Sequence, residues 1–399
     1  MDNSAKPKIV ILGGGFAGMA AARALRGLAR GGHARIEVWD RSADAVMIPA
    51  LPDFAAGLMR REALVGAIRN RLPRSVLWRL KSAHRVDLDA RVIACDEGLV
   101  PYDALIIAAG SSSRPANPDW NASSTYPLAS LADAERIRAD FPCYLERADQ
   151  PHLLFSGGGY TAVELACALR KHVARPGGKP CRITLVDRHR AILPFLSRRQ
   201  TQRLDGRLAK HEIELRLGCQ IKAFNGRDAV LDNGERFEDV FLCRTEGTGP
   251  AIDVSGTKLR REQDGRLAVD PALQVEGYPA VFAAGDAAAI RVHGGFLRKA
   301  VNFAIYSGAC AGKNMARLLR ERPLREYRPV DLGWVIPMAD DSVGLAFGVL
   351  PLQGRPGLML HYFMCGFRNF SLRNFSVFVQ IMLKQALAPS AGKERRDSA

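Results

Sequence analysis

The chain has no closely spaced pair of cysteines. Its 399 residues include eight cysteines, and no two of them form a Cys-x-x-Cys pair. This spacing excludes a zinc finger, and we expect no bound metal. Single cysteines inside apolar segments are typical of reduced core residues in a cytosolic protein.

Long apolar segments are also lacking. No stretch approaches the ~20 uncharged apolar residues that a membrane-spanning helix needs. The amino terminus passes from MDNSAKPK directly into the strand-like run KIVIL, without the charged and then apolar leader of a secreted protein. We therefore expect neither a transmembrane helix nor secretion.

Basic residues outnumber acidic ones, and the formal net charge is +16. Such a charge favours an anionic partner, which could be nucleic acid, an acidic membrane surface or a phosphate-rich cofactor. Aromatic and basic residues are not interleaved as they are in proteins that bind single strands. We therefore expect no nucleic acid among the partners.

The first motif is a glycine-rich turn between a strand and a helix. The apolar run 8–12 leads into Gly13-Gly14-Gly15-Phe16-Ala17-Gly18, an alanine-rich helical stretch follows, and the next strand ends in Asp40. In such a unit Gly13 permits the tight turn, Gly15 lets the backbone approach a pyrophosphate, and Gly18 lets the helix pack on the strand. The helix amino terminus offers N–H groups and a positive dipole to the phosphates. Asp40 is placed to accept hydrogen bonds from ribose hydroxyls.

The same pattern recurs further along the chain. Residues 151–155 lead into Gly157-Gly158-Gly159-Tyr160-Thr161-Ala162-Val163-Glu164, a helix follows, and the next strand ends in Asp187. Ala162 stands at the third glycine position, where a methyl group costs little distance between helix and strand. Two dinucleotide-binding units in one chain predict two bound dinucleotides.

Two further strands end in small residues. The segment 102–110 ends in Ala108-Ala109-Gly110, and the segment 280–286 ends in Gly285-Asp286, before a helical stretch from about 299 to 320. An acid at the end of a strand beside a long cofactor is placed to accept hydrogen bonds from ribityl hydroxyls. These two strands and the two glycine turns, in this order, are unlikely to occur together by chance.

In this order the motifs resemble those of the two-dinucleotide-binding flavoprotein superfamily, over residues 8–330. The resemblance implies an α/β fold with two Rossmann-like domains, one that binds FAD and, inserted in it, one that binds NAD(P)H. The implied FAD contacts are Gly13, Gly15, Phe16, Ala17, Gly18, Asp40, Arg41, Ala109, Gly110, Gly285 and Asp286. The implied NAD(P)H contacts are Gly157, Gly159, Tyr160, Thr161, Glu164 and Asp187.

The resemblance also predicts the domain boundaries. We expect residues 1–112 and 246–330 to form a discontinuous FAD-binding domain and residues 113–245 to form the NAD(P)H-binding domain. Residues 331–388 are expected to form a carboxyl-terminal helical region that associates with a membrane. Residues 389–399 are expected to be a disordered tail.

The absence of cysteines at certain positions reduces the number of superfamily activities that this chain could have. Disulfide reductases need a redox-active cysteine pair, and residues 41–94, where one such pair would lie, contain no cysteine. Sulfide:quinone reductases need cysteines that flank the flavin, and no cysteine lies between Gly110 and Cys143. Both activities are therefore disfavoured.

The last part of the chain lacks acidic residues. From Ser342 through Lys393 there is no Asp or Glu, while basic residues are spread among large apolar ones. Apolar residues at helical spacing with basic flanks are typical of an amphipathic helix that lies on an anionic bilayer. A core helix or a homodimer interface would have a similar pattern, and these alternatives stay open.

With this tail the chain resembles type II NADH dehydrogenases, the single-subunit NADH:quinone oxidoreductases that do not pump protons, and apoptosis-inducing-factor-like quinone reductases are a near second. In the dehydrogenases the helix after Gly-Asp carries Ala-Gln-x-Ala-x-Gln against the quinone. Alignment on Ala304 and Ile305 puts Asn302 and Tyr306 where the two glutamines would be. The resemblance thus implies that Asn302 and Tyr306 face a quinone.

Two residues of the second motif bear on the nicotinamide dinucleotide. Asp187 would bond the adenosine ribose of NADH and repel a 2′-phosphate, whereas the basic residues 188–190 could hold that phosphate. We favour NADH and leave NADPH open. Glu164 could position the nicotinamide, support proton transfer, or bond the backbone at the start of the helix.

The sequence therefore predicts an FAD-dependent oxidoreductase that takes hydride from NAD(P)H and reduces a membrane quinone. We expect it as a peripheral protein on the cytoplasmic face of the cell membrane. A soluble reductase of a ferredoxin or rubredoxin and a non-enzymatic redox-sensing flavoprotein are the alternatives. The acid-free tail argues against the first, and the intact second glycine turn argues against the second.

Overall fold

The computed structural model describes residues 6–175, 177–369 and 372–387. They divide into two compact units. The first contains the described residues up to Val46, with Gly66–Ser112 and Thr248–Asp331. The second contains Met47–Val65, Ser113–Gly247 and the described residues from Leu332 onwards. The predicted tail, 389–399, lies outside the described residues.

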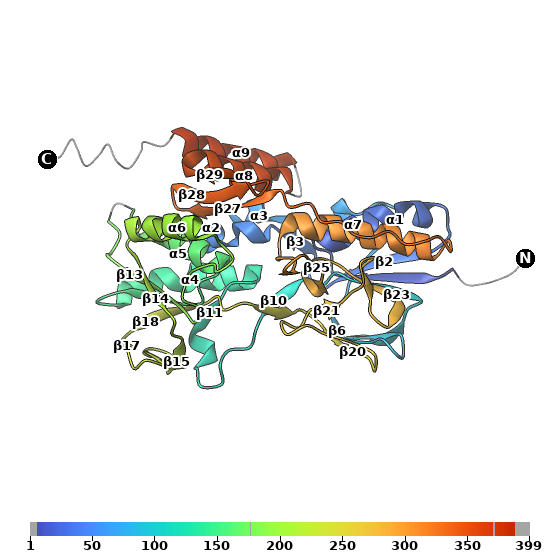
Figure 1. Cartoon of the computed structure of the whole chain (residues 1–399), viewed down its shortest axis with the longest axis horizontal. Helices are drawn as coiled ribbons and strands as arrows, with labels where there is room; N and C mark the ends of the chain where they lie inside the picture. Colours follow the sequence, from blue (N-terminus) through green and yellow to red (C-terminus); the bar gives the residue numbers. More distant parts are fainter. Residues whose placement is uncertain (1–5, 176, 370–371, 388–399) are drawn as a thin grey trace, which may run out of the picture. The chain divides into compact units, whose positions relative to one another are not determined.

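The first unit is built on a six-stranded sheet between two layers (Figure 1). Helices α1 (Phe16–Arg30) and α7 (Val301–Leu318) lie side by side on one face. A four-stranded sheet lies on the other face, and a continuous apolar core joins the layers. The six strands, in spatial order, are β22 (Gln274–Val275), β23 (Tyr278–Ala283), β9 (Ala104–Ile107), β1 (Lys8–Leu12), β2 (Arg35–Asp40) and β5 (Leu77–Leu80). The four are β20 (Asp253–Ser255), β6 (Ala83–Asp87), β7 (Val92–Cys95) and β8 (Gly98–Pro101).

In this unit the apolar sequence of the strands fits their place between two covering layers. Strand β1 pairs in parallel with β2 and β9, and β9 pairs in parallel with β23. Parallel strands covered on both faces need continuous apolar runs, and four of the five residues of β1 are buried. The carboxyl ends of parallel strands meet at one edge of the sheet, so the motifs that end at Asp40, Gly110 and Asp286 are brought to the same edge.

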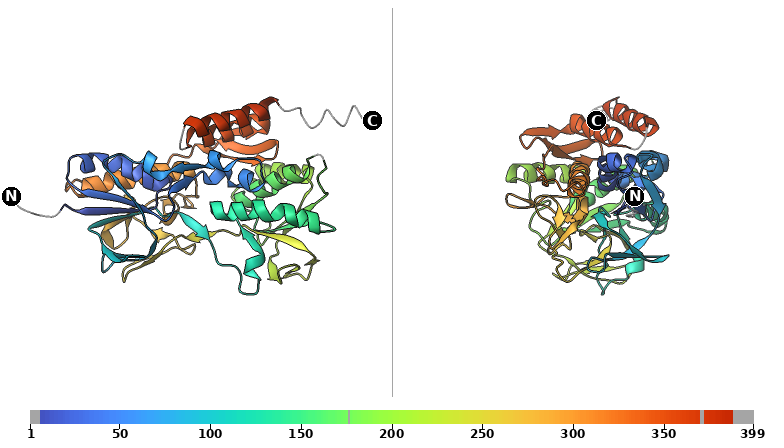
Figure 2. Two further views of the ribbon diagram at one scale, coloured as in Figure 1. Left: turned by 180° about the vertical axis from the view of Figure 1, so that it is seen from behind. Right: turned by 90° about the vertical axis from the view of Figure 1, so that its right-hand side faces the viewer.

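The second unit repeats this plan with a five-stranded parallel sheet. Its strands, in spatial order, are β11 (Thr125–Pro127), β18 (Val240–Arg244), β12 (His152–Ser156), β13 (Arg182–Asp187) and β14 (Ile213–Leu217). Helices α4 (Leu131–Arg147), α5 (Tyr160–Val173) and α6 (Arg198–Lys210) lie along one face, and a small antiparallel sheet lies on the other (Figures 1 and 2). That sheet consists of β15 (Ile221–Phe224), β16 (Ala229–Leu231) and β17 (Arg236–Phe237). The predicted α/β architecture with two Rossmann-like folds is thus confirmed.

The carboxyl-terminal region belongs to the second unit. It begins with a three-stranded antiparallel sheet of β27 (Gly333–Met338), β28 (Asp341–Ala346) and β29 (Leu350–Gln353). Helices α8 (Gly354–Phe367) and α9 (Leu372–Leu387) follow and pack on each other (Figure 1). The sequence predicted helices alone here, because the strands are short and β28 is buried on both faces, so its sequence has no clear two-residue period. Among the described residues, no helix combines the length and the apolar character needed to cross a bilayer.

Residues 47–65 also fall in the second unit, although the sequence-based division places them in the FAD-binding domain. The reason is the packing of α2 (Leu51–Ala55) against α4 and α5. The remaining helices and strands are short: α3 (Arg61–Leu64), β3 (Asp44–Val46), β4 (Val65–Ala67), β10 (Ser111–Ser113), β19 (Thr248–Pro250), β21 (Leu267–Ala268), β24 (Ala288–Ala289), β25 (Arg291–Val292) and β26 (Gly295–Phe296).

Candidate functional site

The first glycine turn is closed on one side and open on the other. Gly13 has a φ of +102°, and a Cβ there would lie 2.3 Å from the carbonyl oxygen of Ala108. A Cβ at Gly18 would lie 1.8 Å from the carbonyl oxygen of Gly13, so only glycine lets α1 approach the turn this closely. At Gly15, in contrast, no described atom lies within 4 Å of an added Cβ. The open side therefore has room for a phosphate group against the backbone.

The amino terminus of α1 is available to an anion. Gly15 is the N-cap, no described side chain caps the helix, and its first turn contains no acidic residue. Phe16 is half-buried and Ala17 is buried in that turn. Backbone N–H groups at a helix amino terminus and the positive end of the helix dipole attract phosphate oxygens. These features fit the pyrophosphate of a dinucleotide.

Asp40 lies beside the same turn. Its Oδ2 accepts a hydrogen bond of 2.7 Å from the backbone N–H of Gly14, and its Oδ1 accepts one of 2.8 Å from the N–H of Ser42. Both bonds hold the carboxylate at the end of β2, where a ribose would follow the phosphates. Arg41, the next residue, is exposed.

The remaining predicted FAD contacts lie in the first unit as well. Asp286 follows β23, and its Oδ2 accepts a hydrogen bond of 3.0 Å from Ser111 Oγ. Gly110, just after the half-buried Ala109, has a φ of +74° with open space beside it. Gly285, with a φ of +63°, donates its backbone N–H to Ser307 Oγ at 3.0 Å, which ties this turn to α7.

The second glycine turn reproduces the geometry of the first. Gly157 has a φ of +100°, and a Cβ there would lie 2.9 Å from the backbone of Glu246. No described atom lies within 4 Å of an added Cβ at Gly159, the uncapped N-cap of α5. Gly158 donates its N–H to Asp187 Oδ2 at 2.6 Å, just as Gly14 does to Asp40. A second dinucleotide pyrophosphate fits this turn for the same reasons.

Several side chains around the second glycine turn already contact neighbouring protein residues. Asp187 Oδ1 also accepts a hydrogen bond from the backbone N–H of His189 at 2.8 Å. Tyr160, the first residue of α5, stacks on Phe195 at 5.4 Å between ring centroids and meets Trp334 edge-on at 6.2 Å. The neighbouring Thr161 is half-buried. The turn is thus bordered by aromatic rings, which sequence reasoning missed because residues 160, 195 and 334 are far apart in the chain.

Glu164 lies in the second turn of α5, close to an acid that sequence reasoning missed. Burial raises the pKa of Glu164 well above its usual range, and the nearby Asp53 carboxylate raises it further. Burial also raises the pKa of Asp53 to about 6, although a hydrogen bond from Tyr362 works in the opposite direction. No local signal marks Asp53, since it is a single acid in the short apolar helix α2.

Asn302 and Tyr306 lie four residues apart on α7, on the same side of the helix. Their environments differ. Asn302 is only 5% exposed, and its Nδ2 points to the carbonyl oxygen of Val330 at 3.5 Å. Tyr306 is 50% exposed. Of the two predicted quinone contacts, Tyr306 is therefore the more accessible.

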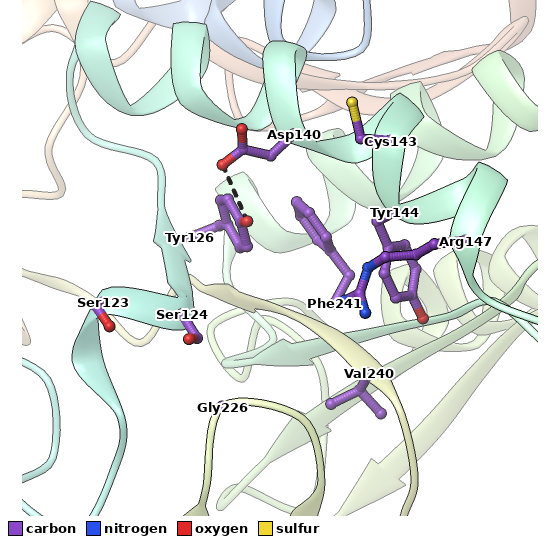
Figure 3. A pocket seen from close by; sticks show the side chains of 10 residues that line it. All are labelled: Ser123, Ser124, Tyr126, Asp140, Cys143, Tyr144, Arg147, Gly226, Val240 and Phe241. Carbon is purple, nitrogen blue, oxygen red and sulfur yellow. Dashed lines mark hydrogen bonds between the residues drawn. The ribbon is translucent and has the colours of Figure 1, made fainter.

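A separate cavity of about 290 Å³ lies against α4 and β18 (Figure 3). In its wall the rings of Tyr126 and Phe241 stack at 3.9 Å, and the Tyr126 hydroxyl donates to Asp140 at 3.0 Å. Neither glycine turn contributes a residue to this wall. We therefore place the dinucleotide sites at the turns and not in this cavity.

Exposed apolar side chains gather in the carboxyl-terminal region. We call them the C-terminal apolar group: Phe347, Val349, Leu350, Phe363, Phe367 and Leu383. They come from the β28–β29 connection, from the first residue of β29, and from α8 and α9. Arg355 and Lys384 lie on the same two helices. Large apolar side chains exposed together with basic ones are typical of an interaction surface.

Comparisons with known proteins agree with this geometry. The model of the pyridine nucleotide-disulphide oxidoreductase family matches residues 7–308. A type II NADH:quinone oxidoreductase of Staphylococcus aureus is 23% identical over 375 residues, covering 88% of this chain and 92% of that protein. The resemblance inferred from the motifs is thereby confirmed.

Two solved structures have similar folds. NDH2 of Plasmodium falciparum in complex with NADH has a TM-score of 0.81 at 15% identity, covering 96% of this chain and 99% of that one. The sulfide:quinone oxidoreductase of Aquifex aeolicus has a TM-score of 0.78 at 17% identity, covering 97% and 94%. At these identities the likeness concerns the fold alone.

Proposed function

The chain belongs to the pyridine nucleotide-disulphide oxidoreductase family, and from this premise we propose that it passes electrons from NADH through FAD to a membrane quinone. It is an FAD-dependent oxidoreductase with NADH as its substrate. The proposal adds the acceptor, the site residues and the place of action. One support is the similarity to a type II NADH:quinone oxidoreductase, which covers 88% of this chain.

The first glycine turn would hold FAD. Gly15 and the uncapped end of α1 would bind the pyrophosphate, Asp40 the ribose, and Asp286 the ribityl hydroxyls. FAD accepts a hydride from the nicotinamide and passes two electrons onward, and the protein contributes orientation and electrostatics.

Helix α7 would stabilise the extra negative charge of the reduced state. Its N-cap is Ala300, and its first turn contains no acidic residue. The preceding Lys299 is held by a 2.6 Å hydrogen bond from its Nζ to Thr248 Oγ1. A helix amino terminus carries a positive partial charge of ~0.5, which favours a nearby anion.

The second glycine turn would hold NADH. Gly159 and the uncapped end of α5 would bind the pyrophosphate, and Asp187 would accept hydrogen bonds from the adenosine ribose. A carboxylate there repels the 2′-phosphate of NADPH, so we assign NADH as the preferred substrate. Glu164 would donate a hydrogen bond to the nicotinamide end, since its raised pKa keeps a proton on the carboxyl group.

The observation that carries the quinone assignment is the C-terminal apolar group. A membrane quinone is reached most directly by an enzyme that rests on the bilayer, and exposed apolar residues near basic ones favour such contact. Phe347 and Val349 are 69% and 81% exposed, and exposed apolar residues in larger patches mark interaction sites. We propose that this region rests on the cytoplasmic face of the membrane, and that Tyr306 donates a hydrogen bond to the quinone.

Vesicle binding and quinone turnover test this assignment together. We would replace Val349 and Phe367 by serine and measure flotation with vesicles that contain anionic lipid. The matched control is Leu99→Ser, which removes a side chain that is 70% exposed in the first unit. We expect the double variant to lose vesicle binding and turnover with a long-chain quinone, while turnover with a short-chain, water-soluble quinone is retained.

Three other outcomes would overturn parts of the proposal. Equal vesicle binding by the double variant and by Leu99→Ser would remove the membrane role of the C-terminal apolar group. A dimer that the double substitution dissociates would assign that group to a homodimer interface. NADH-dependent flavin reduction without turnover of any quinone would favour a protein acceptor.

A further inference from the structure

The protein holds the acids beside its two glycine turns in different ways. The carboxylate of Asp40, at the first turn, accepts backbone N–H groups of Gly14 at 2.7 Å and of Ser42 at 2.8 Å. The Ser42 hydroxyl points elsewhere and donates to the carbonyl oxygen of Asp44 at 3.0 Å. In the part of the chain that the structure describes, no side chain therefore donates a hydrogen bond to the Asp40 carboxylate.

Asp187, at the second turn, has the same two backbone bonds and one side-chain contact in addition. Its Oδ2 accepts the N–H of Gly158 at 2.6 Å, and its Oδ1 accepts the N–H of His189 at 2.8 Å. The imidazole Nδ1 of His189 lies 2.7 Å from the same Oδ1. A carboxylate oxygen has about two acceptor positions, so both positions of this Oδ1 are filled. A ribose hydroxyl must therefore bond Oδ2 or displace the imidazole.

The turn that carries His189 is held in place from the neighbouring strand. The backbone N–H of Gly218, just after β14, donates to the carbonyl oxygens of Asp187 at 2.8 Å and of His189 at 3.0 Å. The side chain of His189 is nevertheless 50% exposed, whereas that of Asp187 is 15% exposed. The backbone is thus fixed while the imidazole can exchange protons with the solvent.

The charges around this contact leave Asp187 as the anion that the imidazole meets. On β14 the residue paired with Asp187 is uncharged, and Arg216 beside it donates to Glu235 at 2.9 Å. The first turn of α5 contains no acidic residue. The loop itself adds two exposed basic residues, Arg188 and Arg190.

We propose that His189 is a positioning residue that sets the choice between NADH and NADPH through Asp187. When the imidazole is neutral, a ribose hydroxyl can displace it from Asp187 Oδ1, and the free carboxylate repels a 2′-phosphate. When the imidazole is protonated, it pairs with Asp187 and cancels much of that negative charge. The site then accepts NADPH better and NADH less well. This inference rests on the proposed role of Asp187 at the adenosine ribose.

The physical reason is that a hydrogen bond between two charged groups is stronger than one with a neutral donor. A protonated imidazole is therefore harder to displace from Asp187 than a neutral one. Histidine is also the side chain whose charge changes between about pH 5 and pH 8. The preference for NADPH over NADH should consequently increase as the pH falls through this range.

Calorimetric titration of the oxidised, FAD-loaded protein with NAD⁺ and with NADP⁺ measures this preference without turnover. Between about pH 8 and pH 6 the NADP⁺-to-NAD⁺ affinity ratio of the wild type should rise about 2- to 10-fold more than that of His189→Ser, which corresponds to one hydrogen bond. His189→Ser reproduces the serine at position 42 of the first turn. The 2′-phosphate also gains a proton near about pH 6, and this contribution is common to both proteins.

Two further variants test whether the charge of His189 is responsible. His189→Lys keeps a positive charge beside Asp187 over the whole range, so its affinity ratio at pH 8 should exceed that of the wild type. The matched control is His84→Ser, which removes another exposed imidazole whose Nε2 lies 2.6 Å from a carboxylate oxygen, that of Asp96 in the first unit. It should show the wild-type ratio at every pH.

The outcomes separate this inference from the proposed function. Equal pH dependence of the ratio in the wild type and in His189→Ser would overturn the inference, even if Asp187→Ser changes the ratio. An unchanged ratio in Asp187→Ser would overturn the proposed ribose contact itself. If calorimetry detects too little binding, the NADPH-to-NADH ratio of kcat/KM for flavin reduction, measured by stopped flow, decides between the same outcomes.

Discussion

Replacing Gly159 by alanine adds a methyl group where the structure has open space. Gly159 has a φ of −79° and a ψ of −176°, which any residue adopts, and no described atom lies within 4 Å of the added carbon. We therefore expect the free energy of unfolding to change by less than ~0.5 kcal/mol, as for a neutral surface change. The same methyl group would occupy the place of the NADH pyrophosphate.

The expected loss of NADH affinity follows from the hydrogen bonds that the displaced phosphate can no longer make with the backbone. A hydrogen bond to a charged group contributes about 1.5–3 kcal/mol. Loss of one such bond corresponds to a KM for NADH roughly 10- to 150-fold higher, at 1.4 kcal/mol for each factor of ten. The maximal rate of flavin reduction should change much less, because the methyl group lies at the phosphates and not at the reacting atoms.

The assay combines a urea unfolding curve with a titration of NADH-dependent flavin reduction. The matched control is Gly206→Ala on α6, where an added Cβ also meets no described atom within 4 Å. Alanine in a helix interior should stabilise the protein by about 0.5–1 kcal/mol and leave the KM unchanged. A Gly159→Ala variant with unchanged KM would refute the placement of the pyrophosphate at this turn.

Three further changes have predictable results. Gly18→Ala should destabilise the protein by about 1–3 kcal/mol and weaken retention of FAD, since its Cβ would lie 1.8 Å from the Gly13 carbonyl oxygen; thermal unfolding and flavin content measure this, and an unchanged Tm would refute it. Asp187→Ser should raise the NADPH-to-NADH ratio of kcat/KM, and an unchanged ratio would count against the assignment of Asp187 to the adenosine ribose. Burial lowers the pKa of His152 from 6.5 to about 4 in the folded protein. As the pH falls below 6.5, the unfolded chain therefore binds a proton that the folded protein does not. The stability that comes from a neutral His152 is complete above pH 6.5 and is lost as the pH falls towards 4. Between pH 7 and pH 5 the loss should be about 2 kcal/mol in urea unfolding, and His152→Gln should remove it; equal pH dependence in the variant would contradict the reasoning.

The parts of the fold that sequence alone predicted are those with a local signature. Each glycine turn lies within one strand–turn–helix unit, and its glycines are required by contacts that the unit itself creates, such as Gly18 against Gly13. The acids that end β2 and β13 follow from the same unit, and the structure holds each one to its own turn by a backbone hydrogen bond. Local patterns of this kind need no knowledge of the rest of the chain.

The parts that were missed depend on contacts between distant segments. Tyr362 and Asp53 are 309 residues apart, and neither stands in a recognisable pattern. The short strands β27–β29 escaped because an acid-free apolar stretch has no clear two-residue period. The commitment of Asn302 to the backbone at Val330 is likewise a tertiary contact, so the motif alignment could place this residue but could not find its burial.

The most direct test of the proposed electron path is a two-step anaerobic titration of the FAD-loaded protein. NADH is added until the flavin absorbance is bleached, and a quinone is then added in steps while the absorbance is followed. The account predicts bleaching by one equivalent of NADH and full recovery with one equivalent of quinone, each at a rate that supports steady-state turnover. A flavin that NADH bleaches but no quinone restores would contradict the assignment of a quinone as the acceptor.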